Sequence, residues 1–314
     1  MVGLLINRLL HAVAVLFGVV SVTFALLHLA GDPLAGLIPP GAAPEVERQI
    51  RIAYGLDRPL PEQYLDFVGH AMRGDFGDSW RQGRPALGAV LERLPATLWL
   101  TAVATVMAVA VGSFLGVISA SRPGSPWDIV ARSTALLGQA VPAFWLGTML
   151  ILLFAVALQW LPSSGLQGPP GVILPALSLA TYPAATLTRL LRASMIETLG
   201  ADYIRTARAK GLSRSRILIE HSLRNAALPA LTFTGLQVGF LLGGAVIVEG
   251  VFAYPGIGGL ALDAVAARDI PLVEAFVWVV AVMILVVNLL TGALAMLLDP
   301  RLREDGLKLG GAAS

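Results

Sequence analysis

The chain has 314 residues, of which 56% are hydrophobic and 13% charged, and its formal net charge is +2. A mean hydropathy of +0.76 excludes an ordinary soluble domain, and so small a net charge gives no reason to expect nucleic acid as a partner. The lack of cysteine excludes disulfides, thiolate metal sites and cysteine nucleophiles. The charged residues stand in blocks between apolar runs of about 20 residues, the length that a helix needs to cross a bilayer.

These apolar runs predict an all-α membrane protein with six transmembrane helices. The short alternating segments of a membrane β-barrel are not visible. The predicted spans are residues 9–30, 97–120, 133–160, 172–192, 229–250 and 272–298. Pro142 lies inside the third run and predicts a kink near Gln139. The first run can also be interpreted as a signal peptide cleaved after Ala30, but its length and the later spans disfavour this.

The charges of the short loops predict the orientation. From Arg189 to Arg224, eight basic residues stand against three acidic ones, whereas Glu249–Asp269 holds one basic and three acidic residues. This alternation places both termini in the cytoplasm. The predicted divisions are a first transmembrane helix at 1–30, an external cap of short helices at 31–96, a membrane core at 97–298 with a cytoplasmic loop at 193–228, and a cytoplasmic tail at 299–314.

No Asp, Glu, Lys or Arg lies near the middle of any predicted span, and neither half of the chain resembles the other. Ion-coupled transporters usually bind their ion at depth and are often built from repeats, so this class is disfavoured. The chain also lacks a GxxxxGK[ST] loop for nucleotide phosphates. If it moves a solute, the energy must come from other subunits.

One basic stretch, RTARAKGLSRSRILIEHSLRN at Arg205–Asn225, carries six Lys and Arg residues. Asp202 before it can act as an N-cap, and Gly211 can take the left-handed conformation that ends a helix. Ser213 can then cap a second helix that runs to about Leu223. Two short helices joined at a tight glycine turn are predicted.

The first of these helices carries a stripe of mostly small residues, Ile204, Ala207 and Gly211, with Arg205 and Arg208 beside it. A small, smooth face with a basic rim suits docking in a groove of another protein. A basic segment held on anionic lipid is the plainer alternative. A DNA-binding helix-turn-helix is sterically disfavoured, because spans begin within a few residues on both sides. Spacing alone does not separate docking from lipid binding.

At these residues the chain resembles the membrane subunit of an ATP-binding-cassette importer, in the branch that takes up dipeptides and oligopeptides. That superfamily carries a loop pattern of EAA, three residues, Gly, nine residues, Ile, one residue and Leu-Pro. Ala207, Gly211 and Leu223 match it. The departures are Arg205 for the Glu, His221 for the Ile and Arg224 for the Pro, and they are typical of the permease type with a long first external segment.

The resemblance extends over nearly the whole chain and follows the family's order. Its strings are LHLAGDP, YGLDRPLPEQYLDFV, GDFGDSW, RLPATLWL, PAFWLGTMLILLF, WLPSSG, VEGVFAYPGIGG and LLDPRLR. One such string would be weak support, but eight in sequence favour the docking interpretation of the basic loop.

The resemblance implies a type I importer permease fold in the bacterial cytoplasmic (inner) membrane. A second, homologous permease would pair with this chain, and an external substrate-binding protein would deliver the peptide. Two cytoplasmic ATP-binding-cassette subunits would hold ATP and Mg, so this chain itself would be no enzyme and hold no cofactor. Similar permeases carry nickel chelates, glutathione or opines. The residues implied at the ATPase contact are Arg205, Thr206, Ala207, Arg208, Lys210, Gly211 and Leu223.

Polar residues inside the predicted spans are candidates for the translocation path: Gln139, Thr186, Thr188, Gln237 and Asn288. Each can instead hydrogen-bond a neighbouring helix. Glu249 can meet a peptide amino group or lock an external gate, or be an interfacial charge paired with Arg268. The four histidines lack metal-ligand spacing, and Ser163 and Ser164 have no apparent base nearby, so neither a metal site nor a hydrolase is expected.

Overall fold

A computed structural model of the protein describes residues 2–29, 43–53, 57–166 and 168–298. Within these residues the regular structure is helical, and one isolated β-bridge joins Asp78 to Pro85. The all-α prediction is confirmed. The contacts divide the chain into two compact units, Met1–Thr97 with Pro255–Val286 and Leu98–Tyr254 with Val287–Ser314.

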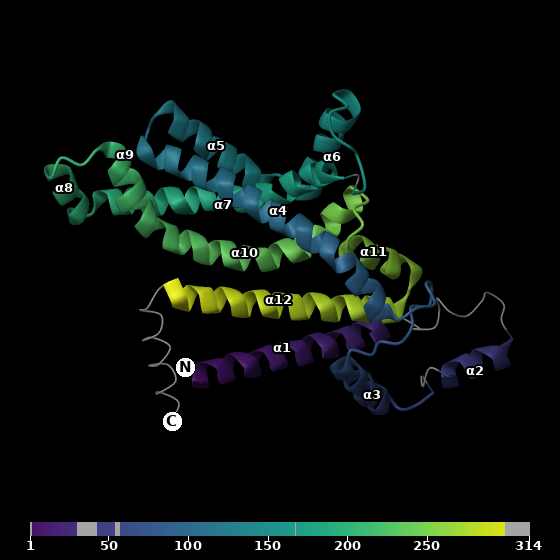
Figure 1. The fold of residues 1–314 in the computed structure, drawn as a ribbon. Coiled ribbons are helices and arrows are strands. Elements are labelled where there is room, and N and C mark those ends of the chain that lie inside the picture. The colour runs from purple at the N-terminus through teal and green to yellow at the C-terminus, as the bar shows by residue number, and fades with distance from the viewer. Residues whose placement is uncertain (1, 30–42, 54–56, 167, 299–314) are drawn as a thin grey trace. The chain divides into compact units, whose positions relative to one another are not determined.

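The described residues form fifteen helical elements, of which Figure 1 labels the α-helices. In chain order they are α1 (Val2–Leu29), α2 (Pro44–Ala53), α3 (Leu60–Arg73), α4 (Ala86–Ser121), α5 (Pro126–Ala140), α6 (Ala143–Leu150), the π-helical η2 (Ile151–Ala157), the 3₁₀ turn η3 (Pro169–Val172), α7 (Ile173–Gly200), α8 (Asp202–Ala209), α9 (Arg214–Arg216), the π-helical η4 (Ile217–Leu223), α10 (Arg224–Val251), α11 (Ile257–Ala267) and α12 (Ile270–Leu298).

Four helices in the described residues are long and apolar enough to cross a membrane: Ala86–Ser121, Pro169–Gly200, Arg214–Val251 and Ile270–Ala293. They correspond to the predicted second, fourth, fifth and sixth spans. In the region of the predicted first span, α1 contains a shorter apolar stretch, Val13–Leu26. The described residues therefore contain four such helices, or five if the bent pair α5 and α6–η2 is one span.

The predicted third span is interrupted more sharply than a kink. The helices Pro126–Ala140 and Ala143–Ala157 meet at an angle of 106°. Pro142 has no N–H for a helical bond, and Val141 before it is extended at φ −85° and ψ 122°. Proline thus ends α5 and begins α6, and the kink predicted within residues 133–160 is a break between two helices.

The unit that contains the N-terminal region is held together by aromatic and polar contacts. On α3, Tyr64 packs edge-on against Phe24 of α1 and shares a 2.6 Å hydrogen bond with Ser21. At the start of α12, the buried Asp269 carboxylate accepts hydrogen bonds from the Ser79 hydroxyl at 2.5 Å and the Arg81 N–H at 3.1 Å. Asp269 thereby ties the turn after α3 to α12.

In the other unit α7 is the central helix. In the most apolar 18-residue stretch of this helix 72% of the residues are buried, whereas 28% are buried in the corresponding stretch of each of the other three long helices. It packs against α5, α6 and α10 (Figure 1). On α4, Gly112 and Gly116 face it: a Cβ on Gly112 would lie 2.8 Å from the Ala184 carbonyl oxygen, and one on Gly116 3.1 Å from the Leu191 Cβ. This small-xxx-small pattern permits close helix packing within a membrane.

We expect Gly112→Ala to destabilise this unit by about 1–3 kcal/mol, since the added methyl forces two backbones apart in a packed interface. Gly243→Ala on α10 is the matched control, because a Cβ there meets nothing within 4 Å and alanine favours a helix by about 1 kcal/mol. Thermal unfolding of the purified protein checks the pair. Equal midpoints for the two variants would show that Gly112 is not a packing residue.

Candidate functional site

Residues Asp202–Leu223, which we call the elbow, contain the basic stretch found in the sequence. Helix α8 ends at a turn in which Gly211 has φ +77°, and the Ser213 side chain accepts a hydrogen bond from the Arg216 N–H that starts α9. The predicted glycine turn and serine cap are confirmed. Figure 1 shows α8 and α9 adjoining at one end of their unit.

Two details of the elbow differ from the prediction. Asp202 is the first residue of α8 and Ala201 is its N-cap, so Asp202 does not cap the helix by its side chain. The second helix is also not short, because α9, η4 and α10 form one continuous helix from Arg214 to Val251. No proline or glycine stands between Ser213 and Pro229 to interrupt it. The elbow is therefore continuous with the span.

Two of the three residues of the stripe predicted to dock on a partner face inward. Ile204 and Ala207 are 0% and 5% exposed, and they form a small core with Ile217 on the following helix. Leu199 and Leu212 pack against this core. Ile204 and Ala207 thus serve the packing of the elbow on itself, and the role of Ala207 at an ATPase contact stays a prediction.

The opposite face of α8 is exposed and basic. The exposed residues here are Arg205, Thr206, Arg208, Lys210 and, in the turn, Gly211, together with Asp202, Tyr203 and Ala209. Among the described residues, an ion pair joins Arg205 to Asp202 at 3.2 Å, with side chains 77% and 94% exposed, and so open a pair contributes little. Leu223, at the end of η4, is half-buried. The outer face therefore offers uncommitted positive charge.

Contacts with neighbouring helices hold the elbow in place. Arg214 donates a short hydrogen bond to the Ser121 carbonyl at the end of α4, and the Ser222 hydroxyl donates to the Met195 carbonyl of α7 at 3.4 Å. A cavity of about 590 Å³ lies between the elbow and the turn after α4, with Pro123 and Arg208 among its lining residues.

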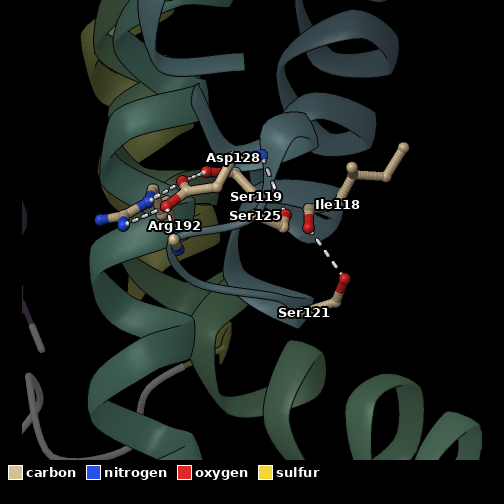
Figure 2. A network of polar contacts seen from close by, with 7 residues as sticks. Ile118, Ser119, Ser121, Ser125, Asp128 and Arg192 are labelled. Carbon is tan, nitrogen blue, oxygen red and sulfur yellow. Dashed lines mark hydrogen bonds and ion pairs between the residues drawn. The ribbon is translucent and has the colours of Figure 1, made fainter. Parts of the chain in front are cut away.

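Beside the elbow a buried ion pair joins α5 to α7. Arg192 donates to both carboxylate oxygens of Asp128, from Nε at 2.8 Å and from Nη2 at 3.0 Å. The same carboxylate accepts from the Ser119 hydroxyl at 2.5 Å and the Gly124 N–H at 2.9 Å. Figure 2 shows Asp128 between Ser119 and Arg192, with Ser125 below. Asp128 is 1% exposed and Arg192 24%, so the network locks the α4–α5 turn to α7.

Further along the same two helices, predicted path residues come together. The Gln139 amide donates to the Thr186 hydroxyl at 2.9 Å, and Arg189 Nη1 donates to the Gln139 carbonyl oxygen at 2.5 Å. They belong to a cavity of about 890 Å³ between α5 and α7, which we call the arginine groove. It is lined by Ile129, Arg132, Ser133, Leu136, Gln139, Thr186, Arg189, Leu190, Arg192 and Ala193.

The other candidates lie apart from this groove. Thr188 is buried and donates to the Ala184 carbonyl of its own helix at 2.8 Å. Gln237 is 9% exposed and Glu249 is fully buried on α10, while Asn288 is exposed on α12. These positions stay predictions. Sequence reasoning passed over Arg132, Arg189 and Arg192 as loop charges, although Thr186, Arg189 and Arg192 repeat every three residues on one helix face.

Family models match both parts of the chain. Residues 112–304 match the binding-protein-dependent transport system inner membrane component, and residues 1–101 match the N-terminal part of such a membrane component. The chain belongs to this family of permeases. It is the multi-pass inner membrane component of an ATP-binding-cassette importer.

Relatives of this permease cover almost its full length. It is 39% identical to the dipeptide transport system permease protein DppB of Escherichia coli (strain K12), over 97% of this chain and 99% of DppB. It is 38% identical to the oligopeptide transport system permease protein AppB of Bacillus subtilis (strain 168), over 96% and 99%. It is 39% identical to the glutathione transport system permease protein GsiC of E. coli (strain K12), over 96% and 99%.

Solved structures agree on the permease fold. The inward-facing MetNI methionine ABC transporter is similar with a TM-score of 0.54 at 17% identity, and the match covers 67% of this chain and 96% of that one. An amino acid ABC transporter solved with histidines is similar with a TM-score of 0.50 at 20% identity, over 68% and 94%. The type I importer fold is therefore shared.

Proposed function

We propose that this permease is one of two homologous membrane subunits of an ATP-driven peptide importer, and that the outer face of its elbow docks on a cytoplasmic ATPase subunit. The observation that carries the proposal is the exposed basic face of α8 on an elbow packed by Ile204, Ala207 and Ile217. A rigid support with uncommitted charge suits docking, since basic groups orient a partner while the packed core resists deformation.

The elbow can pass motion on in two directions. It is continuous with α10, and the Ser222–Met195 bond joins it to α7. The Asp128–Arg192 pair then connects α7 to α5. We propose that closure of the ATPase subunits, which would hold ATP and Mg, moves these helices as one body. ATP hydrolysis is therefore expected on the partner ATPase subunits, and this chain supplies the gate of the translocation path.

The proposed topology has six spans with both termini in the cytoplasm. Helix α1 supplies the first span through its shorter apolar stretch, Val13–Leu26. Residues 31–96, which include α2 and α3, form the external cap that meets a substrate-binding protein. Residues 97–298 form the permease core, the loop 193–228 contains the elbow, and the tail 299–314, with the end of LLDPRLR, lies outside the described residues.

The proposed cargo is a dipeptide or short oligopeptide. The relatives DppB and AppB support this assignment by their names and full-length coverage. Glutathione is the second candidate, because GsiC is 39% identical over a similar length. Nickel chelates and opines rest on the family resemblance alone.

Reconstitution of the whole importer tests the proposal. The permease is expressed with its partner permease, ATPase subunits and binding protein, and uptake into proteoliposomes is measured with dialanine or glutathione. We expect co-isolation of the ATPase subunits and dialanine uptake that requires ATP. Uptake by this chain alone, driven by an ion gradient, would contradict the proposal, and ATP-dependent uptake of glutathione without dialanine would move the substrate to the second candidate.

Substitution of Gly211 tests the docking turn. A Cβ at Gly211 meets nothing within 4 Å, but φ is +77°. Gly211→Asn is therefore expected to fold normally, because asparagine tolerates this conformation, whereas Gly211→Val, like Gly211→Leu, costs about 1–2 kcal/mol of backbone strain. Gly211→Leu adds bulk that only a partner can meet. If Gly211→Leu inserts normally and keeps wild-type ATP-dependent uptake, the turn does not seat in the ATPase.

A further inference from the structure

The arginine groove combines size and charge in a way that the packing of α5 and α7 alone does not require. Its volume of about 890 Å³ is within the range of small-molecule sites. Arg132, Arg189 and Arg192 line it, and among the described lining residues there is no acidic side chain. Such a groove suits an anionic ligand of modest size.

The nearest carboxylate leaves most of this charge uncompensated. Asp128 is buried and already accepts from Ser119, Gly124 and both Arg192 nitrogens. It neutralises Arg192 only. Arg189 uses Nη1 to bond Gln139, and Arg132 makes no hydrogen bond or ion pair within the described part of the chain. A guanidinium has five donors in a planar fork, so both arginines retain donors for a ligand.

The positions of these groups extend along the groove. Asp128 at the start of α5 meets Arg192 near the end of α7, and Gln139 at the end of α5 meets Thr186, so the two helices are antiparallel. Arg132 and Gln139 are seven residues apart on α5, about 10 Å along a helix. Charge thus lies toward the elbow end, and the amide and hydroxyl lie deeper in the span.

The charge of Arg189 argues against a lipid-facing surface. It lies within the helix Pro169–Gly200, which is apolar enough to span a membrane. Arginines inside spans usually face a protein interior or a water-filled cavity, because contact with hydrocarbon is costly. The groove walls are otherwise apolar, at Ile129, Leu136 and Leu190, and such walls accept varied side chains without holding them tightly.

We propose that the arginine groove binds the C-terminal carboxylate of the peptide in transit, with Arg132 and Arg189 as its donors and the Gln139–Thr186 pair beside the peptide backbone. The inference rests on the proposed peptide-import function and deepens it. Guanidinium groups pair with carboxylates in bidentate fashion, and the site releases cargo toward the elbow end. An anionic lipid headgroup in the groove is the alternative that the test must exclude.

A unique thiol makes the groove measurable, because the chain has no cysteine. Ser133→Cys places a thiol in the lining, and its modification by a charged, membrane-impermeant reagent is followed on this chain by mass spectrometry in the assembled importer. We expect saturating dialanine to slow the modification about tenfold, since only the unoccupied fraction reacts. Dialanine amide, which lacks the carboxylate, is expected to protect far less.

Arginine variants in the same background complete the test. Arg132→Gln with Arg189→Gln is expected to abolish protection by dialanine, while Arg122→Gln, an exposed arginine outside the groove, keeps it. Three results would overturn the proposal. The amide could protect as well as dialanine, the thiol could be unreactive even without peptide, or phosphatidylglycerol in nanodiscs could protect it.

The proposed function is judged separately, by ATP-dependent dialanine uptake in the wild-type importer. Uptake without thiol protection contradicts the groove assignment alone. Absence of any peptide uptake contradicts the proposed cargo itself.

Discussion

Arg192→Met is expected to destabilise the permease by about 3–5 kcal/mol, because it leaves a buried carboxylate without its cation. Asp128 is 1% exposed and would keep only the Ser119 and Gly124 donors. Asp128→Asn is expected to cost less, about 1–2 kcal/mol, since Arg192 is 24% exposed and can turn its charge toward water. The specific expectation is that Arg192→Met loses more stability than Asp128→Asn.

The double variant Asp128→Asn with Arg192→Met separates pairing from packing. It leaves no unpaired buried charge, so its loss should be smaller than that of Arg192→Met alone. The exposed pair of Arg216 and Glu220, 2.8 Å apart with side chains 61% and 54% exposed, gives the control, and Arg216→Met should stay within about 0.5 kcal/mol. Thermal unfolding of the purified importer measures all four. Equal losses for Asp128→Asn and Arg192→Met would refute the asymmetry.

Reversal of charge on the outer face of the elbow is expected to abolish coupling. The triple variant Arg205→Glu, Arg208→Glu and Lys210→Glu changes exposed side chains only, so its thermal stability should remain close to wild type. A docked partner would meet like charges, at a cost of several kcal/mol, which lowers ATPase association by about 100-fold or more. Co-isolation of the ATPase subunits and ATP-dependent uptake are the readouts.

A charge exchange on the same elbow is the matched control for this reversal. Arg216→Glu with Glu220→Arg keeps the net charge and the i, i+4 pair and should leave co-isolation unchanged. Neutral replacement of the three outer residues by glutamine should give an intermediate loss, and the difference from wild type should shrink as the salt concentration rises, because salt screens the exposed charges of the wild type. Normal coupling in the triple reversal would show that the elbow's outer face meets no subunit.

The long helices could be predicted because their apolar runs are a local signal. α4, α7, α10 and α12 all lie where spans were expected, and Gly211 and Ser213 shape the elbow as their residue types indicate. The break at Pro142 was foreseen as a kink, but proline alone does not specify its 106° bend, since α5 and α6 each pack against α7.

The functional groups were harder to predict because their partners are remote in sequence. Ile204 and Ala207 suited either docking or packing, and only contact with Ile217 shows that they pack. Asp128 and Arg192 are separated by 64 residues, and no local pattern joins them. Gln139 and Thr186 were chosen for polarity inside spans, whereas Arg132 and Arg189 appeared as ordinary loop charge.

Cross-linking at the elbow tests the central claim most directly. Thr206 is exposed and its neighbour Ala207 is 5% exposed, and the chain has no cysteine of its own. In the assembled importer, Thr206→Cys with a short thiol-to-amine cross-linker should join this permease to an ATPase subunit, and Ala207→Cys should do so poorly. A thiol at position 206 that reacts fully with a water-soluble reagent in the active importer and yields no such product would contradict the account.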